Sequence, residues 1–204
     1  DFEFSQPPGH NPKPVCCTFL DLKTNKLFTQ WLISEIHDWP FDSNKTLYIC
    51  HSAVAEISCM LELGLSRPNL VWDTLVQDKK LFSGLEQRFD LLECCKRFGI
   101  DTISAAQKDI YRNLIITKYP NYSDSEKQKI IEYNITDVKE NAALFMAQCA
   151  LFEKKDKNFK KLLSQAIFHG RSQGVVAKTE RNGIPINNNL YNDMEEFFPE
   201  IKAQ

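Results

Sequence analysis

The chain has 204 residues, of which 43% are hydrophobic and 25% are charged, values that are typical of a globular protein. This length suits one large domain or one domain with an appendage, and with seven glycines and nine prolines little of the chain resembles a flexible linker. The net charge of −2 does not indicate a basic nucleic-acid-binding protein, but it allows an enzyme whose acidic site binds metal ions before a phosphate enters.

The cysteines and the hydropathy pattern further limit the class of protein and its cellular compartment. The seven cysteines are odd in number, two pairs are adjacent in sequence, and no CxxC spacing occurs, so we expect free thiols in a reducing cytoplasm. No apolar run approaches the roughly 20 residues that cross a bilayer, and no signal peptide precedes the domain. We therefore expect no membrane partner.

The N-terminal third of the chain predicts β-strands. The opening residues 1–5 resemble the end of a strand whose first half is absent, so we expect this strand to end near Glu3 and the chain to be a piece of something longer. Residues 6–14 hold four prolines and one glycine and predict a loop. Runs of β-forming residues over 14–20 and 27–32 flank a turn-like segment, which predicts a hairpin.

The remainder predicts one strand–helix–strand unit followed by helices. Short apolar runs at 47–50 and 70–73 predict buried strands, and apolar residues at helical spacing over 53–63 predict a helix between them. Further helices are predicted over 84–98, 104–118, 123–153 with a break near Asn134, 156–169 and 171–182. This order predicts an α/β fold in which helices cover a mixed β-sheet.

Three acidic motifs are candidates for chemistry. Asp1 and Glu3 are two apart on a strand and point to the same face, where their repulsion calls for a cation. Tyr133 and Asp137 share one helix face, although a tyrosine at a core edge beside a surface aspartate explains the same spacing. Glu56 lies in the first turns of a helix, where a carboxylate is favourable for electrostatic reasons alone, but its apolar neighbours indicate that it faces inward.

In this order the motifs resemble those of the DEDD-type 3′→5′ exonucleases of the tyrosine subtype, specifically the proofreading domains of family A DNA polymerases of phages and bacteria. Asp1-Phe2-Glu3 resembles the first motif, residues 51–56 the second and residues 133–137 the third. Trp72-Asp73-Thr74 is similar to the Asp-Thr that follows the second motif. Residues 95–115 and 170–186 also resemble segments of such proteins, so the likeness covers nearly the whole chain.

The resemblance implies a ribonuclease H-like fold, a mixed β-sheet flanked by helices with a helical C-terminal extension. It implies an exonuclease domain over residues 1–153 and a helical connection toward a polymerase module over 154–204. It also implies a site in which Asp1, Glu3, Glu56 and Asp137 bind two divalent metal ions, Mg²⁺ or Mn²⁺. Glu3 would lie close to the attacking water, and Tyr133 would form a hydrogen bond with it.

The implied substrate is the 3′ end of single-stranded DNA, with a covalently attached polymerase domain as a partner, in the cytoplasm of a bacterial or phage-infected cell. Phe4 is a candidate platform for a base, and its placement in the core is an equally good interpretation. Lys108 and Arg112 are four residues apart on a predicted helix and are candidates for phosphate contacts, or for an ordinary solvated face.

One departure from the family pattern bears on activity. The second motif normally supplies an aspartate, and this chain has Glu56, whose extra methylene displaces the carboxylate. Because Mg²⁺ demands near-octahedral geometry, the change is expected to weaken one metal site. The change, with the acidic net charge, leaves open a domain that keeps the fold and guides DNA without cutting it. An RNA-trimming relative of the same superfamily is a further alternative.

Overall fold

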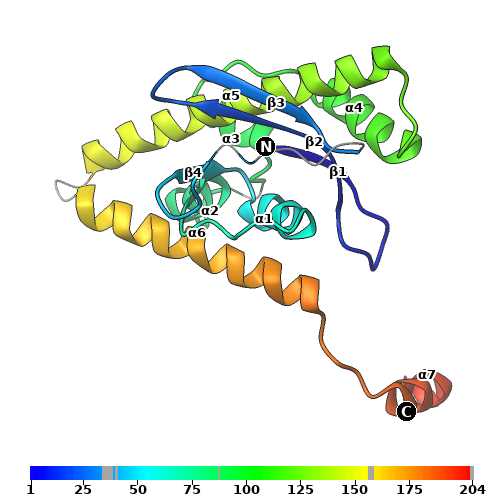
Figure 1. Cartoon of the computed structure of the whole chain (residues 1–204). Coiled ribbons are helices and arrows are strands. Elements are labelled where there is room, and N and C mark those ends of the chain that lie inside the picture. The colour runs from blue at the N-terminus through cyan, green and yellow to red at the C-terminus, as the bar shows by residue number, and fades with distance from the viewer. Residues whose placement is uncertain (34–38, 40, 87, 156–158, 203–204) are drawn as a thin grey trace.

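The computed structural model describes residues 1–33, 39, 41–86, 88–155 and 159–202, which form five strands and seven helices (Figure 1). Strands β1 (Phe2–Ser5), β2 (Lys13–Asp21) and β3 (Lys26–Trp31) form an antiparallel sheet in the order β1-β2-β3. Strands β4 (Leu47–Cys50) and β5 (Leu70–Asp73) form a parallel ladder, with helix α1 (Ala53–Glu62) between them in sequence. Parallel and antiparallel strands combined with helices confirm the predicted α/β class.

The predicted hairpin of β2 and β3 is confirmed, and the turn chemistry explains it. Asp21 accepts a hydrogen bond from the Lys23 backbone N–H at 2.9 Å and another from the Thr24 hydroxyl at 2.7 Å. Strand β1 extends past Glu3 to Ser5, because a register shift after Glu3 lets the following residues pair again with the start of β2. The expectation that this strand ends near Glu3 was therefore short by two residues.

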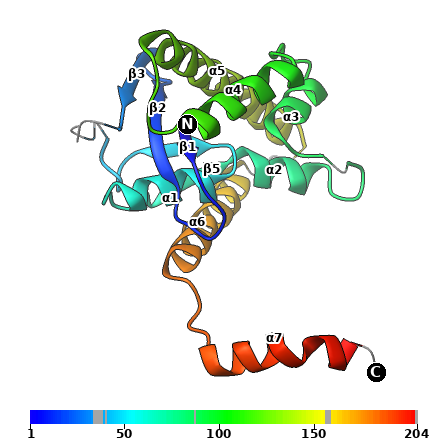
Figure 2. The ribbon, with the colours of Figure 1, turned by 90° about the vertical axis from the view of Figure 1, so that its right-hand side faces the viewer.

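The remaining helices, except α7, pack around the strands. Their bounds are α2 (Thr74–Leu81), α3 (Leu91–Arg97), α4 (Ala105–Lys118), α5 (Asp124–Lys155), α6 (Phe159–Asn182) and α7 (Asn188–Lys202). Helix α5 packs against β2, and α6 packs against α1 and β5 (Figure 1). Helix α7 lies apart from the rest of the fold at the C-terminal end (Figure 2). None of the described helices is long and apolar enough to cross a membrane.

The predicted helix over 84–98 is wrong in its first half. Gly84 has a positive φ of 79°, and α3 begins only after Asp90, whose side chain accepts a hydrogen bond from the Glu93 N–H at 3.2 Å. Helix α2 was not predicted; it starts directly after β5 because Asp73 caps its first turn. Neither helix boundary follows from hydrophobic spacing, since both are set by capping side chains.

Two predicted interruptions are also wrong. Helix α5 continues through Asn134 without a break, because this side chain bonds to other residues and does not compete with the helix backbone. Helix α6 continues through Gly170, whereas separate helices over 156–169 and 171–182 were expected, residues 156–158 lying outside the described part. Because α6 packs on α1 and β5, its segment is attached to the main body, and the domain division after residue 153 stays a prediction.

Gly170 permits the close packing of α6 on β5. A Cβ at this position would collide with the backbone carbonyl oxygen of Val71, which cannot move without disturbing the ladder. We expect Gly170→Ala to lower the free energy of unfolding by about 1–3 kcal/mol, although alanine is the better helix former. Urea denaturation followed by circular dichroism measures this difference.

Gly174, one turn further along α6, provides the matched control for this prediction. A Cβ there would lie 2.6 Å from the Cδ atom of Arg67, the flexible part of a side chain that can move aside. Gly174→Ala is therefore expected to change the free energy of unfolding by less than about 1 kcal/mol. Equal effects of the two substitutions would contradict the close packing assigned to Gly170.

Candidate metal centre

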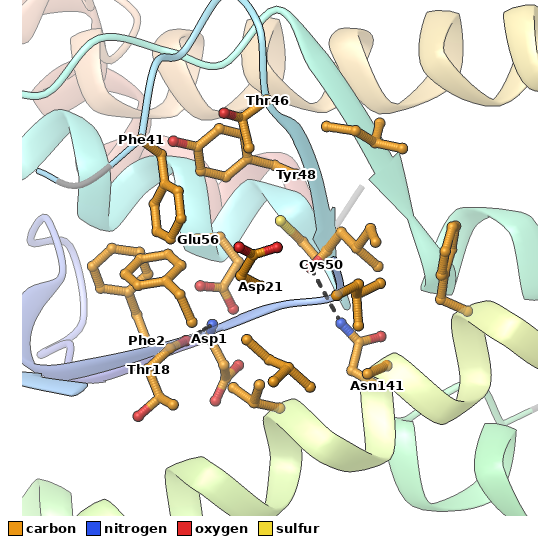
Figure 3. A pocket seen from close by; sticks show the side chains of 18 of the residues that line it. Asp1, Phe2, Thr18, Asp21, Phe41, Thr46, Tyr48, Cys50, Glu56 and Asn141 are labelled. Atoms are coloured by element: carbon orange, nitrogen blue, oxygen red, sulfur yellow. Dashed lines mark hydrogen bonds between the residues drawn. The ribbon is translucent and has the colours of Figure 1, made fainter. Parts of the chain in front are cut away.

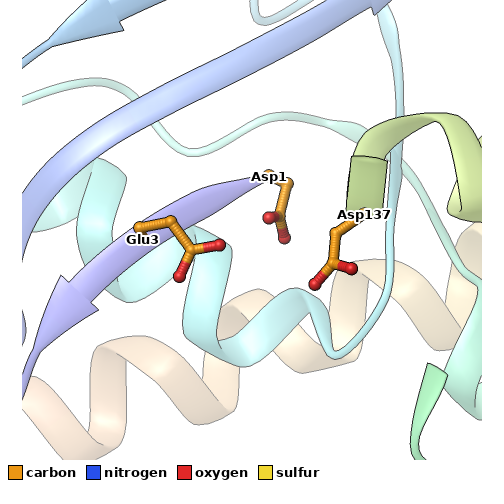
Figure 4. A group of neighbouring side chains, drawn as sticks. All are labelled: Asp1, Glu3 and Asp137. Carbon is orange, nitrogen blue, oxygen red and sulfur yellow. The ribbon is translucent and has the colours of Figure 1, made fainter. Parts of the chain in front are cut away.

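Three carboxylates that are far apart in sequence meet at one end of β1. Asp1 directly precedes this strand, Glu3 lies on it, and Asp137 comes from α5. One ligand oxygen from each lies within 4.8 Å of the other two. Figure 4 shows the three carboxyl groups turned toward a common space. The prediction that Asp1 and Glu3 share a face is confirmed, and the packing of α5 on the sheet adds Asp137.

Burial, together with repulsion from the neighbouring carboxylates, changes the protonation of Glu3. Burial raises the pKa of the Glu3 carboxyl to about 8, and the charges of Asp137 and Glu56 contribute to the increase. The amide of Asn134 opposes this increase in pKa, because it donates hydrogen bonds to the carboxylates. Its nitrogen lies 2.6 Å from Asp1 Oδ2 and 3.4 Å from Glu3 Oε1. In the absence of a cation the Glu3 carboxyl therefore keeps its proton at neutral pH.

Lys108 provides the principal positive charge next to Asp137. Its Nζ lies 2.6 Å from Asp137 Oδ1 and 2.9 Å from Glu140 Oε2, and Glu140 also accepts a hydrogen bond from the Ile103 N–H at 3.1 Å. Only 3% of Lys108 is exposed, so the expectation that it lies on a solvent-facing helix surface is wrong. In this position Lys108 contacts two carboxylates, and a phosphate contact would require it to leave both.

The sequence interpretation missed Glu140, although a signal for it exists. Glu140 follows Asp137 by three residues and therefore shares its helix face. Two carboxylates on the inner face of a helix require a buried cation, which α4 supplies as Lys108. Burial alone would lower the pKa of Lys108, but Asp137 and Glu140 raise it above its ordinary value, so this lysine stays charged.

Tyr133 lies one turn before Asp137 on the inner face of α5. Its ring stacks on that of Tyr111 with centroids 4.9 Å apart and planes inclined by 14°, a contact that the sequence interpretation missed. Its hydroxyl lies close enough to the Glu3 and Asp137 carboxylates for their charges to act on it. Burial and the charges of Glu3 and Asp137 raise its pKa well above the ordinary value. The phenol is therefore protonated at neutral pH and acts as a hydrogen-bond donor.

Glu56 lies beside the three carboxylates but outside their group. It is buried on α1, and its carboxylate lies near the backbone N–H of Phe2. Its Oε2 atom is buried and has no hydrogen-bond partner among the described residues. Burial raises the pKa of its carboxyl. Four carboxylates were expected to lie together, and three of them do. Glu56 faces the same strand but lies outside this group.

The position of α1, and with it that of Glu56, depends on Asp73. This carboxylate accepts hydrogen bonds from the N–H groups of Ser52 and Ala53 at 3.2 and 2.8 Å, and it also caps α2. The adjacent Thr74 hydroxyl lies 3.0 Å from His51 Nδ1, and the other ring nitrogen of His51 lies 3.1 Å from the Phe89 carbonyl oxygen. Asp73 and Thr74 therefore support the site without belonging to it, and His51 is a packed, hydrogen-bonded residue.

The remaining candidates for nucleic-acid contacts divide between core and surface. Phe4 is half-buried and packs against the apolar cluster around Phe2, in agreement with the core interpretation. Arg112 is exposed on α4, and its charge acts on the hydroxyl of Tyr133. Arg112 thus keeps a position from which a basic group can reach the site, and its contact with phosphate stays a prediction.

Comparison of the chain with protein-family models, with curated proteins and with solved structures gives no match. The chemistry of the side chains therefore carries the functional interpretation.

The raised pKa of Glu3 predicts how stability depends on pH in the presence of a chelator. Unfolded Glu3 releases its proton near its ordinary pKa of 4.5, whereas folded Glu3 holds it until about pH 8. Over this window the folded state binds more protons, so stability falls as pH rises, with about 1.4 kcal/mol per pH unit as the upper limit.

Comparison with Glu3→Gln isolates this contribution, because the other titrating groups are shared. The difference in unfolding free energy between the two proteins, measured by urea denaturation from pH 5 to pH 8.5, should move steadily in favour of the glutamine variant. A difference that stays constant across this range would show that Glu3 is ionised throughout.

Proposed function

We propose that the chain is a metal-dependent 3′→5′ exonuclease that hydrolyses the terminal phosphodiester bond at the 3′ end of single-stranded DNA, as a proofreading domain of a family A DNA polymerase does. The observation that carries the proposal is the convergence of Asp1, Glu3 and Asp137 within 4.8 Å, with the Tyr133 hydroxyl close enough for the charges of Glu3 and Asp137 to act on it. The same residues carry the resemblance in motif order, which also supports a ribonuclease H-like fold.

The donor set suits hard divalent cations. The three grouped residues offer only carboxylate oxygens, which Mg²⁺ and Mn²⁺ prefer. The unpartnered Glu56 Oε2 is a further buried oxygen next to them, a group that is costly to leave unsatisfied. Asp1, Glu3 and Asp137 would hold the ions, and Glu56 would complete the set. When bound, two such ions would lower the pKa of the attacking water and neutralise charge on the phosphate.

The protein side chains have separate roles in this reaction. The Tyr133 hydroxyl, which stays protonated, donates a hydrogen bond to the oxygen of the attacking water and so orients it. Without metal Glu3 holds its proton until about pH 8, so its carboxylate would accept a hydrogen bond from the same water once bound cations have displaced that proton. Stacking on Tyr111 fixes the Tyr133 ring, so that the hydroxyl is in place before substrate arrives. Arg112 on the exposed face of α4 attracts the DNA backbone.

A non-cutting domain that guides nucleic acid is the second candidate. The contact of Lys108 with Asp137 favours it, because the lysine already neutralises a carboxylate that a metal ion would need. The Glu56 side chain, longer than the aspartate of the family motif, favours it as well. Calorimetric titration with Mn²⁺ separates the two candidates: binding that Asp137→Asn abolishes supports the nuclease, and absence of binding supports the guide.

Activity on a 5′-labelled single-stranded DNA with Mn²⁺ tests the proposal directly. We expect a ladder of products shortened from the 3′ end, and RNA of the same sequence degraded more slowly. Glu3→Gln should lower the rate by at least about 100-fold, because one misplaced ligand disturbs the whole geometry. Tyr133→Phe should lower it less, since the water keeps its other partners.

Glu132→Gln provides the matched control for these variants. Glu132 is an exposed residue adjacent to Tyr133 on the same helix, and among the described residues its carboxylate bonds to Gln128 alone, so its loss should leave the rate unchanged. If no nucleotide is released by the chain as it stands, and Glu56→Asp does not produce release, the nuclease proposal is wrong.

A further inference from the structure

Lys108 forms two ion pairs whose acceptors differ in one respect. Its Nζ lies 2.6 Å from Asp137 Oδ1 and 2.9 Å from Glu140 Oε2. Asp137 belongs to the group of three carboxylates that the proposed metal centre requires, whereas Glu140 lies outside that group. The ammonium of Lys108 therefore bridges a proposed metal ligand and a carboxylate that the metal does not need.

The contact with Asp137 conflicts with the binding of a divalent cation. A cation bound to Asp137 would lie close to the Lys108 ammonium, and like charges at such a separation repel strongly in a poorly hydrated site. Lys108 is buried, so its charge cannot leave Asp137 without another partner close by. Glu140 is the partner that it already contacts.

Glu140 is well suited to hold the lysine, because its own position is fixed. Its Oε1 atom accepts a hydrogen bond from the Ile103 N–H at 3.1 Å, which leaves Oε2 for Lys108. The next residue on α5, Asn141, donates a hydrogen bond to the Ile49 carbonyl oxygen at 3.4 Å and so ties this turn of the helix to β4 (Figure 3). Lys108, by contrast, carries its charge on a flexible four-carbon chain. The lysine can therefore move while Glu140 stays in place.

We propose that Glu140 is a positioning residue of the metal centre, which draws the Lys108 ammonium away from Asp137 when a divalent cation binds. In the metal-free chain Lys108 bridges the two carboxylates, and in the metal-bound chain it pairs with Glu140 alone. The ammonium stays paired and buried in both states. The pair thereby determines the metal concentration at which the site fills. This inference rests on the proposed function, because it concerns the metal centre of the proposed nuclease.

A double-mutant cycle of Mn²⁺ affinity, measured by calorimetric titration, tests the proposal without an activity assay. Lys108→Met should bind Mn²⁺ at least about tenfold more tightly, because the competing charge is gone. Glu140→Gln should bind it at least about tenfold more weakly, because the ammonium then stays on Asp137. The double variant should bind as tightly as Lys108→Met alone, since Glu140 acts through the lysine.

The double variant also separates the proposal from a simple effect of charge. It has the same net charge as the original chain, because one positive and one negative group are removed together. If the two residues acted on the metal only through their fields, their effects would cancel, and the double variant would bind Mn²⁺ like the original chain. That additive result would overturn the proposal.

Lys139→Met provides the matched control for Lys108→Met. Lys139 is exposed on α5, two residues after Asp137, and the substitution removes the same charge from the surface. Because exposed charges are screened by salt, Mn²⁺ affinity should change by less than about twofold at physiological ionic strength. Tightening equal to that of Lys108→Met would show a general charge effect and would contradict the competition at Asp137.

A second measurement uses the unsubstituted chain, because Lys108→Met leaves two buried carboxylates without their cation and can prevent folding. Nuclear Overhauser contacts of the Lys108 side chain are recorded by NMR without metal and with saturating Mg²⁺. The contacts with Asp137 should weaken on addition of Mg²⁺, and those with Glu140 should persist. Contacts with both residues that stay unchanged at saturation, or that are both lost, would overturn the proposal.

Failure of the proposed nuclease gives a different result from failure of this inference alone. If neither the original chain nor Lys108→Met binds Mn²⁺ at millimolar concentration, no metal centre exists, and both proposals are wrong. If the original chain binds Mn²⁺ in a manner that depends on Asp137 and releases nucleotides, but the cycle is additive, the nuclease stands and the role of Glu140 is wrong.

Discussion

The repulsion among closely spaced, partly buried carboxylates is the constraint on which this site depends. Asp1, Glu3 and Asp137 meet where β1 and α5 pack together, and Glu140 continues the row along α5. Burying such charges is costly unless donors face them. Lys108 from α4 and the Asn134 amide from α5 face these carboxylates and offset the cost of burying them. The group is therefore stable only when β1, α4 and α5 are all packed together. Any cation that binds here competes with these donors for the same oxygens.

A second set of contacts fixes α1 against the strands and thereby positions Glu56. Asp73 joins the end of β5 to the starts of α1 and α2, and the Thr74 hydroxyl donates to Asn141 on α5 at 2.7 Å. The network is buried, and a lost partner would leave polar atoms unsatisfied. The Asp-Thr pair thus connects α5, which carries Asp137, with α1, which carries Glu56. The relative positions of the carboxylates in the proposed metal centre therefore depend on how α1 and α5 pack against β5.

Local signals account for what the sequence could predict. The β2–β3 hairpin and the β4–α1–β5 unit follow from apolar runs and turn residues, and the pairing of Asp1 with Glu3 follows from strand periodicity. The errors arise where tertiary contacts decide. Lys108 is on a helix whose spacing suggests a solvated face, yet Asp137 and Glu140 draw it into the interior. The burial of Lys108 is explained only by a partner more than 25 residues away along the chain. The spacing of residues within α4 does not predict it.

Direct visualisation of bound metal tests the central claim that these carboxylates form a metal centre. A crystal structure with Mn²⁺, in which the ion is identified by its anomalous scattering, would show whether it displaces the Asn134 amide. The account predicts a manganese peak bonded to oxygens of Asp1, Glu3 and Asp137, with Glu56 directly bonded or joined through water. A Mn²⁺-saturated crystal without such a peak, in which Asn134 and Lys108 keep their present contacts, would contradict it.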